Sequence, residues 1–227
     1  MQDIVDYSTE LHAKAVKILL DKTNYQAHQI DLIGYHGQTL YHKPQDKLTL
    51  EIGDGQRLAD LTGITVINDF RSRDIKYGGQ GAPFAPLYHQ ALAIRDKNYP
   101  LAVVNCGGIA NITIIKGLND SDLLGFDTGP GNALIDLYIK RNTACTELMD
   151  KDGKYGSKGV VNQEILQKLY EKSIKDENYL DKMPPKSLDI NDLHLIPDLQ
   201  SLNLEDACRT LEAFTAESIV RSLDPCS

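Results

Sequence analysis

The spacing of apolar residues predicts a helix near each end of the chain. Over the first twenty residues, apolar side chains recur every three or four positions and form one face of an amphipathic helix: Ile4, Tyr7, Leu11, Ala15 and Ile18. Near the other end, Asn203 is placed to cap a helix with an apolar face of its own. The same pattern predicts helices at 57–62, 87–94 and 163–173.

Short apolar runs, several rich in β-branched residues, predict strands between these helices. They lie at 30–35, from Leu48 onward, and at 64–67, 101–105, 109–115 and 123–126. Gly107 and Gly108 join two of these runs as the turn of a β-hairpin. We expect a turn at 127–132 to lead into a helix with Pro130 in its first turn, where proline costs little. Strands that alternate with helices predict an α/β fold.

The segment from Asp96 to Pro100 is the best candidate for a domain boundary. It is polar, and Pro100 disfavours helical geometry in the residue before it. A chain of 227 residues is long enough for two units. We therefore predict one domain over residues 1–97 and a second over 98–227.

Charge and composition narrow the class of protein. A net charge of -8 argues against a protein that binds nucleic acid by neutralising its phosphates. No apolar run approaches the roughly 18 residues of a membrane helix, so we expect no membrane partner and a cytoplasmic location. The cysteines show no CxxC spacing, so reduced thiols are expected rather than a zinc site or a disulfide framework: Cys106, Cys145, Cys208 and Cys226.

Three polar clusters each follow a predicted strand. They span 36–39, 69–74 and 127–132. Ligands gather at the carboxyl ends of strands in α/β sheets, so this placement favours a shared site. Arg71 and Arg73 in the second cluster could bind a carboxylate or a phosphate through the planar guanidinium group, or could form a surface ion-pair network. His36 in the first cluster could contact a ligand, but a lone histidine after a strand is more often a structural residue.

Asp127 is the first candidate for a catalytic residue. We expect it between a strand and a helix N-terminus, with nearby glycines that leave room for a ligand. The helix dipole would favour its ionised form and burial would oppose it, so it could act as a general base. The alternative is an aspartate that only caps the helix or stabilises the turn.

The hairpin glycines are candidates for binding phosphate. Exposed amides at Gly107 and Gly108 could hold phosphate oxygens, although a plain turn is equally consistent with the sequence. The chain contains no GxxxxGK[ST] segment, so a P-loop is not predicted.

The order of these motifs resembles that of the anhydro-N-acetylmuramic acid kinase family. The resemblance rests on GYHGQT at 34–39, TGITVINDFRSRDIKYGGQGAPFAP at 62–86, VNCGGIANIT at 104–113 and GFDTGPGNALID at 125–136. It weakens after Thr143, where PPKS at 184–187 and the final helix still match.

The resemblance implies an actin-like (ribonuclease H-like) fold of two α/β domains with a nucleotide cleft between them. It implies a reaction in which ATP, Mg²⁺ and water open the 1,6-anhydro ring of anhydro-N-acetylmuramic acid and phosphorylate O6, giving N-acetylmuramic acid 6-phosphate for cell-wall sugar recycling. Asp127 would activate the water.

The resemblance also assigns the binding residues. Arg73 would contact the sugar, in one cavity with Asp127, and His36, Asp69 and Asp74 would support it. The ATP phosphates would face Gly107, Gly108 and Asn111.

Two segments of the family pattern are missing from the sequence: the N-terminal GTSxDG-type phosphate loop and the C-terminal adenosine-binding segment. We therefore expect both domains to be incomplete, and the sheet edges left open favour association with the missing segments or with a second copy. The alternatives are a non-catalytic sugar-binding or regulatory remnant and another actin-like sugar or acyl kinase.

Overall fold

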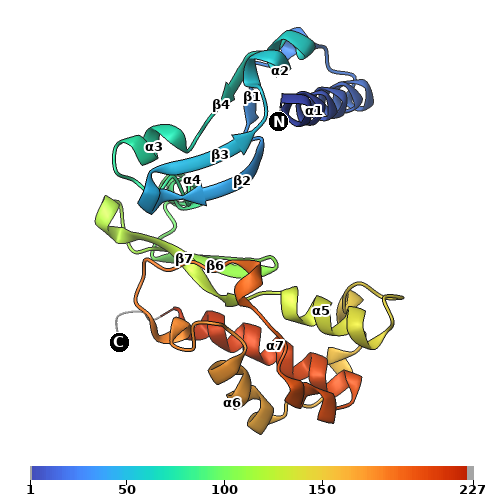
Figure 1. The fold of residues 1–227 in the computed structure, drawn as a ribbon. Helices are drawn as coiled ribbons and strands as arrows, with labels where there is room; N and C mark the ends of the chain where they lie inside the picture. Colours follow the sequence, from blue (N-terminus) through green and yellow to red (C-terminus); the bar gives the residue numbers. More distant parts are fainter. Residues whose placement is uncertain (1, 224–227) are drawn as a thin grey trace. The chain divides into compact units, whose positions relative to one another are not determined.

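A computed structural model describes residues 2–223 of the chain (Figure 1). The chain divides between Pro83 and Phe84 into two compact units, and each contains both helices and small sheets. The protein is therefore of mixed α/β class. In the part of the chain described, no helix is long and apolar enough to cross a membrane.

The first unit carries two small sheets. Its elements are α1 (Gln2–Thr23), β1 (Ile33–Tyr35), β2 (Gln38–Lys43), β3 (Leu48–Ile52), α2 (Gly55–Thr62), β4 (Val66–Asn68) and α3 (Ser72–Lys76). β1 pairs with β4 in parallel, and β2 pairs with β3 in an antiparallel hairpin. The helix predicted over the first twenty residues is confirmed as α1.

Helices α1 and α2 are joined through one buried hydroxyl group. Thr9 is fully buried, and its Oγ1 donates to the Val5 carbonyl at 2.7 Å and accepts the Asp54 N–H at 3.0 Å. Asp54 in turn caps α2 by accepting the Arg57 N–H at 2.9 Å. In contrast, much of the apolar face predicted for α1 is exposed, with Ile4 59% exposed.

The second unit packs helices beside a three-stranded antiparallel sheet of order β5-β6-β7. Its elements are α4 (Ala85–Asp96), β5 (Leu101–Cys106), β6 (Ile109–Ile115), β7 (Leu123–Pro130), α5 (Ala133–Asn142), α6 (Gln163–Lys172) and α7 (Leu204–Arg221). Its largest buried cluster includes Ile139 of α5, Leu169 of α6 and Phe214 of α7, each fully buried. Asn203 caps α7 as predicted, accepting the Asp206 N–H at 2.8 Å.

Helix α4 belongs to the second unit because it packs on β6. His89 Nδ1 lies 2.9 Å from Thr113 Oγ1, within hydrogen-bonding distance. The division between compact units therefore precedes α4, whereas the predicted domain boundary follows it. The assignment of residues 1–97 and 98–227 to two domains of the family fold stays a prediction.

Strand β7 is longer than the sequence pattern indicates. The turn predicted at 127–132 is wrong in its first part, because residues 127–130 continue the strand opposite Ile109, Ala110 and Asn111 of β6. A register shift between Ala110 and Asn111 accommodates the extra residue. Pro130 therefore ends a strand, and α5 begins only at Ala133. Gln38 and Thr39, which end the polar cluster at 36–39, are the first residues of β2.

Candidate functional site

Parallel pairing of β1 and β4 brings two of the predicted polar clusters together in the first unit. Tyr35 is the register partner of Asn68, so the next residues, His36 and Asp69, leave the sheet at the same edge. Both line a hollow of about 300 Å³, together with Thr49 of β3. The clusters at 36–39 and 69–74 thus meet at one hollow, whereas the site expected to include the third cluster, at 127–132, stays a prediction.

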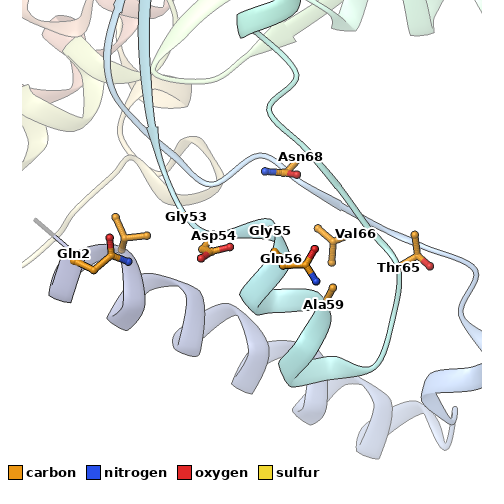
Figure 2. Close-up of a pocket in the computed structure, with 10 residues that line it drawn as sticks. Gln2, Gly53, Asp54, Gly55, Gln56, Ala59, Thr65, Val66 and Asn68 are labelled. Carbon is orange, nitrogen blue, oxygen red and sulfur yellow. The ribbon is translucent and has the colours of Figure 1, made fainter.

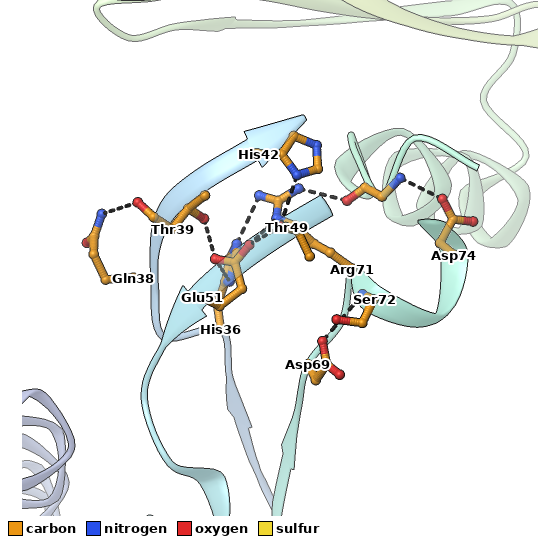
Figure 3. A network of polar contacts seen from close by, with 11 residues as sticks. His36, Gln38, Thr39, His42, Thr49, Glu51, Asp69, Arg71, Ser72 and Asp74 are labelled. Atoms are coloured by element: carbon orange, nitrogen blue, oxygen red, sulfur yellow. Dashed lines mark hydrogen bonds and ion pairs between the residues drawn. The ribbon is translucent and has the colours of Figure 1, made fainter. Parts of the chain in front are cut away.

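Glu51 of β3 is the centre of a polar network at this hollow (Figure 3). Its carboxylate accepts hydrogen bonds from the hydroxyl groups of Thr39 and, at 2.7 Å, Thr49. Arg71 Nε lies 3.3 Å from Oε1, and His36 Nδ1 lies 3.6 Å from Oε2. The Glu51 side chain is only 11% exposed, and each carboxylate oxygen therefore has a hydroxyl partner, with Arg71 beside Oε1 and His36 beside Oε2.

These partners keep Glu51 ionised in spite of its burial. Burial raises the pKa of Glu51, but the hydrogen bonds from Thr39 and Thr49 and then the neighbouring His36 and Arg71 side chains lower it below its ordinary value. Arg71 also donates from Nη2 toward His36 Nε2 at 3.0 Å. Because arginine has no acceptor, Nε2 of His36 must be the acceptor in this contact.

Arg71 and Arg73 have different surroundings. Arg71 reaches back from the start of α3 to Glu51 and His36, and its Nη1 donates to the Gly81 carbonyl at 2.7 Å. Arg73 lies on the exposed surface of α3. The structure thus places Arg71 in the network and leaves the predicted role of Arg73 as a sugar contact untested.

The two predicted aspartates of this segment organise the backbone around α3. Asp69 has a positive φ of 54° and accepts the Ser72 N–H at 3.3 Å, at the start of α3. Asp74 accepts the Gly81 N–H at 2.6 Å, which closes the loop after α3. Asp69 lines the hollow and Asp74 shapes the loop beside it.

Tyr35 adds a buried polar group with no partner. It is 5% exposed, it lines the hollow, and its hydroxyl is among the buried side-chain polar atoms of the described residues without a hydrogen bond. Gly53, at φ 140°, allows the close approach, since a Cβ there would collide with that hydroxyl. An unpaired buried hydroxyl costs about 1–3 kcal/mol, which a hydroxyl or carbonyl on a ligand could offset.

A larger hollow of about 600 Å³ lies between α1, α2 and β4 (Figure 2). Gln2, Gln56 and Asn68 line it, but its carboxylate, Asp54, is engaged in capping α2. The smaller hollow is lined by a histidine and two carboxylates, His36, Glu51 and Asp69, which can form hydrogen bonds with a polar ligand. We therefore take the smaller hollow as the candidate site of the first unit.

Asp127 lies in β7 and is held by the segment at 179–188. Its backbone N–H donates to the Lys186 carbonyl at 3.3 Å, and its carbonyl accepts the Tyr179 hydroxyl at 2.8 Å. The Leu188 N–H donates to Oδ2 of the side chain at 2.9 Å. The alternative that Asp127 caps a helix is excluded, because Asn132 occupies the N-cap position of α5.

The electrostatic environment of Asp127 is set by burial. Burial raises the pKa of the half-buried Asp127, and the hydrogen bond from Leu188 lowers it less, so the pKa lies above its ordinary value. The expected help from a helix dipole is wrong, since α5 begins only at Ala133. A carboxylate with a raised pKa is a stronger base, which suits the activation of water near neutral pH.

Sheet register aligns two asparagines with Asp127. Asn111 of β6 is the partner of Asp127 on one side and of Asn105 on the other. Directly opposed residues of antiparallel strands share a face, so these three polar side chains form a row across the sheet.

Residues 2–227 match the profile of a family described as anhydro-N-acetylmuramic acid kinase. The chain belongs to this family. It is 44% identical over 93% of its length to the anhydro-N-acetylmuramic acid kinase of Zymomonas mobilis, and 41% identical over 95% to that of Rhizorhabdus wittichii. The corresponding enzyme of Methylobacterium nodulans is 43% identical over 95% of the chain. The alignments cover 55%, 56% and 55% of these relatives, so the chain spans about half of their length.

In this family member, the tip of the β5–β6 hairpin packs on the start of α5. The Gly107 carbonyl accepts the Asn132 N–H at 2.7 Å, and the Gly108 carbonyl accepts the Gly131 and Ala133 N–H groups at 2.9 and 3.1 Å. A Cβ on Gly131 would collide with the Gly107 carbonyl, so internal packing requires glycine there. At Gly107 and Gly108 a Cβ would meet only ordinary contacts, so packing within the chain does not explain these two glycines.

Metal ligands and thiols complete the inventory of reactive groups. Within residues 2–223, no group of three or more His, Cys, Asp or Glu side chains is arranged to hold a metal ion. Cys106, Cys145 and Cys208 are free, and Cys226 lies outside the described residues.

Sequence reasoning missed Glu51, Tyr35 and the segment at 179–188. One signal for Glu51 was present: Thr49 and Glu51 alternate with Leu48, Leu50 and Ile52, which indicates a strand with one polar face. No sequence pattern links Leu188 to Asp127, because the two residues are 61 positions apart.

Proposed function

We propose that this chain carries the sugar-binding and water-activating groups of an ATP-dependent kinase that opens the 1,6-anhydro ring of anhydro-N-acetylmuramic acid and phosphorylates O6. Membership of the family supports the reaction class. The single observation that carries the proposal is Asp127, a half-buried carboxylate with a raised pKa whose backbone and one side-chain oxygen are fixed by hydrogen bonds.

Asp127 would act as the general base. Its carboxylate takes a proton from water as the water oxygen attacks the anomeric carbon, and the bond from that carbon to O6 breaks. The released O6 then attacks the γ-phosphorus of ATP, the bond between the γ-phosphorus and the bridging oxygen breaks, and ADP leaves. The raised pKa supports this role because it increases the basicity of the carboxylate.

The hollow of the first unit would hold polar groups of the sugar. His36 and Asp69 line it, and the buried Tyr35 hydroxyl lacks a partner there. Sugars present hydroxyl and amide groups that can donate and accept hydrogen bonds, so such a hollow suits them. We propose Arg73 and Asp74 as further sugar-binding residues. A cavity shared by Arg73 and Asp127 stays a prediction.

The hairpin tip of the second unit would contact the ATP phosphates. Gly107 and Gly108 are not required by internal packing, and Asn111 adds a polar side chain in the row with Asp127. Magnesium, when bound with ATP, would neutralise phosphate charge during transfer. We further propose the actin-like fold for the whole protein, a cytoplasmic location, and association of its open sheet edges with further family segments or a second copy.

The experiment measures ADP release that depends on anhydro-N-acetylmuramic acid, with the Zymomonas mobilis relative as the positive control. Asp127→Asn is expected to lower turnover at least 1,000-fold without unfolding the chain, which is the scale of loss typical for an essential base or a positioned catalytic group. Glu164→Gln is the matched control, because Glu164 is an exposed acid of α6 paired with Lys168. Turnover by Asp127→Asn at the rate of the control would refute the role.

Calorimetry separates the kinase from a non-catalytic sugar-binding protein. Heat of sugar binding that is unaffected by Mg-ATP, together with no ADP release, would favour the non-catalytic alternative. Absence of sugar binding with and without Mg-ATP would reject both functions.

A further inference from the structure

The segment at 179–188 runs along the open edge of β7 and holds Asp127 at three points. β7 is an edge strand, because the sheet order is β5-β6-β7. The Lys186 carbonyl, the Tyr179 hydroxyl and the Leu188 N–H contact the backbone N–H, the carbonyl and Oδ2 of Asp127, respectively. The position of this carboxylate therefore depends on a connection between α6 and α7.

Lys186 contacts both the start of this segment and strand β7 of the sheet. Its Nζ donates to the carbonyls of Tyr179 and Leu180 at 3.2 and 3.0 Å. The same ammonium group lies 5.6 Å from the ring centroid of Phe126 in β7 and 5.0 Å from that of Tyr179. Lys186 thus ties both ends of the segment to the residue that precedes Asp127.

This arrangement differs from that of an ordinary surface lysine. Lys186 is half-buried, and burial lowers its pKa, opposed by the charge of Asp181. A lysine is rarely buried without partners, and here its partners are carbonyls and aromatic rings instead of a carboxylate. No ion pair joins Lys186 to Asp127 among the described residues. The contacts of Lys186 are therefore with the segment and with Phe126, and the Leu188 N–H of the segment contacts the carboxylate of Asp127.

We propose that Lys186 is a positioning residue for Asp127, which keeps the Leu188 N–H on Oδ2 and so leaves Oδ1 to accept the proton of the attacking water. Within residues 2–223, Oδ2 is the carboxylate oxygen of Asp127 with a hydrogen-bond donor. The assignment of Oδ1 rests on the proposed function. The arrangement itself can be tested without sugar or nucleotide, so failure of the kinase assay would not decide it.

The test is an NMR titration of the whole chain. The Leu188 amide proton is expected to shift downfield as Asp127 ionises, with the same midpoint as the side-chain carboxyl carbon of Asp127. The midpoint should lie above the ordinary aspartate value of about 3.9. Asp127→Asn must abolish this shift, because other ionisable groups near the segment could also act on the amide: Tyr179, Asp176, Asp181, Asp189 and Asp192.

Three lysine variants then isolate the role of Lys186. Lys186→Met should reduce the titration shift of the Leu188 amide by more than half and speed hydrogen exchange of the Asp127 and Leu188 amides at least tenfold. Lys186→Arg should retain most of both, since it keeps the charge and the donors. Lys182→Met is the matched control, because Lys182 lies in the same segment but is half-exposed and paired with Asp176.

Each result decides the proposal. The proposal is overturned if Lys186→Met keeps the wild-type titration shift of the Leu188 amide. It is also overturned if the Leu188 amide of the wild type does not titrate with Asp127. If Lys186→Met and Lys186→Arg lose the titration shift of the Leu188 amide equally, while Lys182→Met keeps it, the positive charge of Lys186 has no role. If Lys186→Met does not fold, Lys186→Gln replaces it and is held to the same criteria.

Discussion

Replacing Glu51 with alanine is expected to loosen the β2–β3 hairpin. The Glu51 side chain is 11% exposed and accepts hydrogen bonds from Thr39 and Thr49, which lie on the two strands of the hairpin. It also neutralises Arg71, whose side chain is 19% exposed. The substitution removes the acceptor of two hydroxyl groups and leaves a guanidinium group without its carboxylate.

The magnitude follows from these contacts. A hydrogen bond to a charged group contributes about 1.5–3 kcal/mol, and leaving one member of a buried ion pair alone costs about 3–5 kcal/mol. The hydroxyl groups can rebind water, and Arg71 keeps its contact with the Gly81 carbonyl, which offsets part of the loss. We expect the free energy of opening the β2–β3 hairpin to fall by about 2–3 kcal/mol, so the open form of the hairpin becomes roughly 30- to 150-fold more populated.

Hydrogen exchange read by mass spectrometry measures this change locally. Peptides covering residues 38–52 should exchange faster in Glu51→Ala by that factor, while peptides from α5–α7 of the second unit serve as an internal reference. Asp46→Ala removes an exposed ion pair with Lys43 in the same hairpin and should change exchange less than threefold. If Glu51→Ala also stays within threefold of wild type, the network contributes nothing to stability and the reasoning is refuted.

The pH dependence provides a second check of the same network. The folded-state pKa of Glu51 is lowered, so its contribution to stability is fully present above the unfolded value of about 4.3 and is lost as the pH falls through the folded value. The difference in exchange between wild type and Glu51→Ala should therefore shrink at acidic pH. A difference that grows on acidification would show that the charge of Glu51 is not stabilising.

Two further predictions concern the second unit. Gly131→Ala should destabilise it by about 1–3 kcal/mol through collision with the Gly107 carbonyl, whereas Gly107→Ala should change stability by less than about 0.5 kcal/mol, both measured by urea denaturation. Asp127→Asn should raise stability near neutral pH, because the folded-state pKa of Asp127 is raised and its ionised form therefore destabilises the fold. A difference in denaturation midpoint between wild type and Asp127→Asn that is the same at pH 4 and pH 8 would contradict this.

Local patterns predicted the elements of this fold well where periodicity was strong. The helices α1, α4, α6 and α7 and the β5–β6 hairpin all lie where apolar spacing or glycines placed them. The end of β7 was predicted wrongly, because the glycines and the proline at 129–131 indicate a turn locally. Pairing with β6 outweighs that local preference.

The candidate site was predictable only in part, for a related reason. His36 and Asp69 follow strands that pair in parallel, so a rule about strand ends was sufficient to bring them together. Glu51 lies on a different hairpin, and its importance comes from burial, which the sequence does not reveal. The holding of Asp127 by Leu188 depends on the path of a long connection, and no local propensity encodes such a path.

The bonds between the hairpin tip and α5 would couple the proposed nucleotide contact to the helices of the second unit. The N–H groups at 131–133, at the start of α5, donate to the carbonyls of Gly107 and Gly108. The Gly131 carbonyl accepts the Thr215 hydroxyl of α7 at 2.8 Å. The hairpin tip is therefore connected by hydrogen bonds to α5 and, through Gly131, to α7. An anion that pulled the tip outward would have to drag the start of α5 with it or break these bonds.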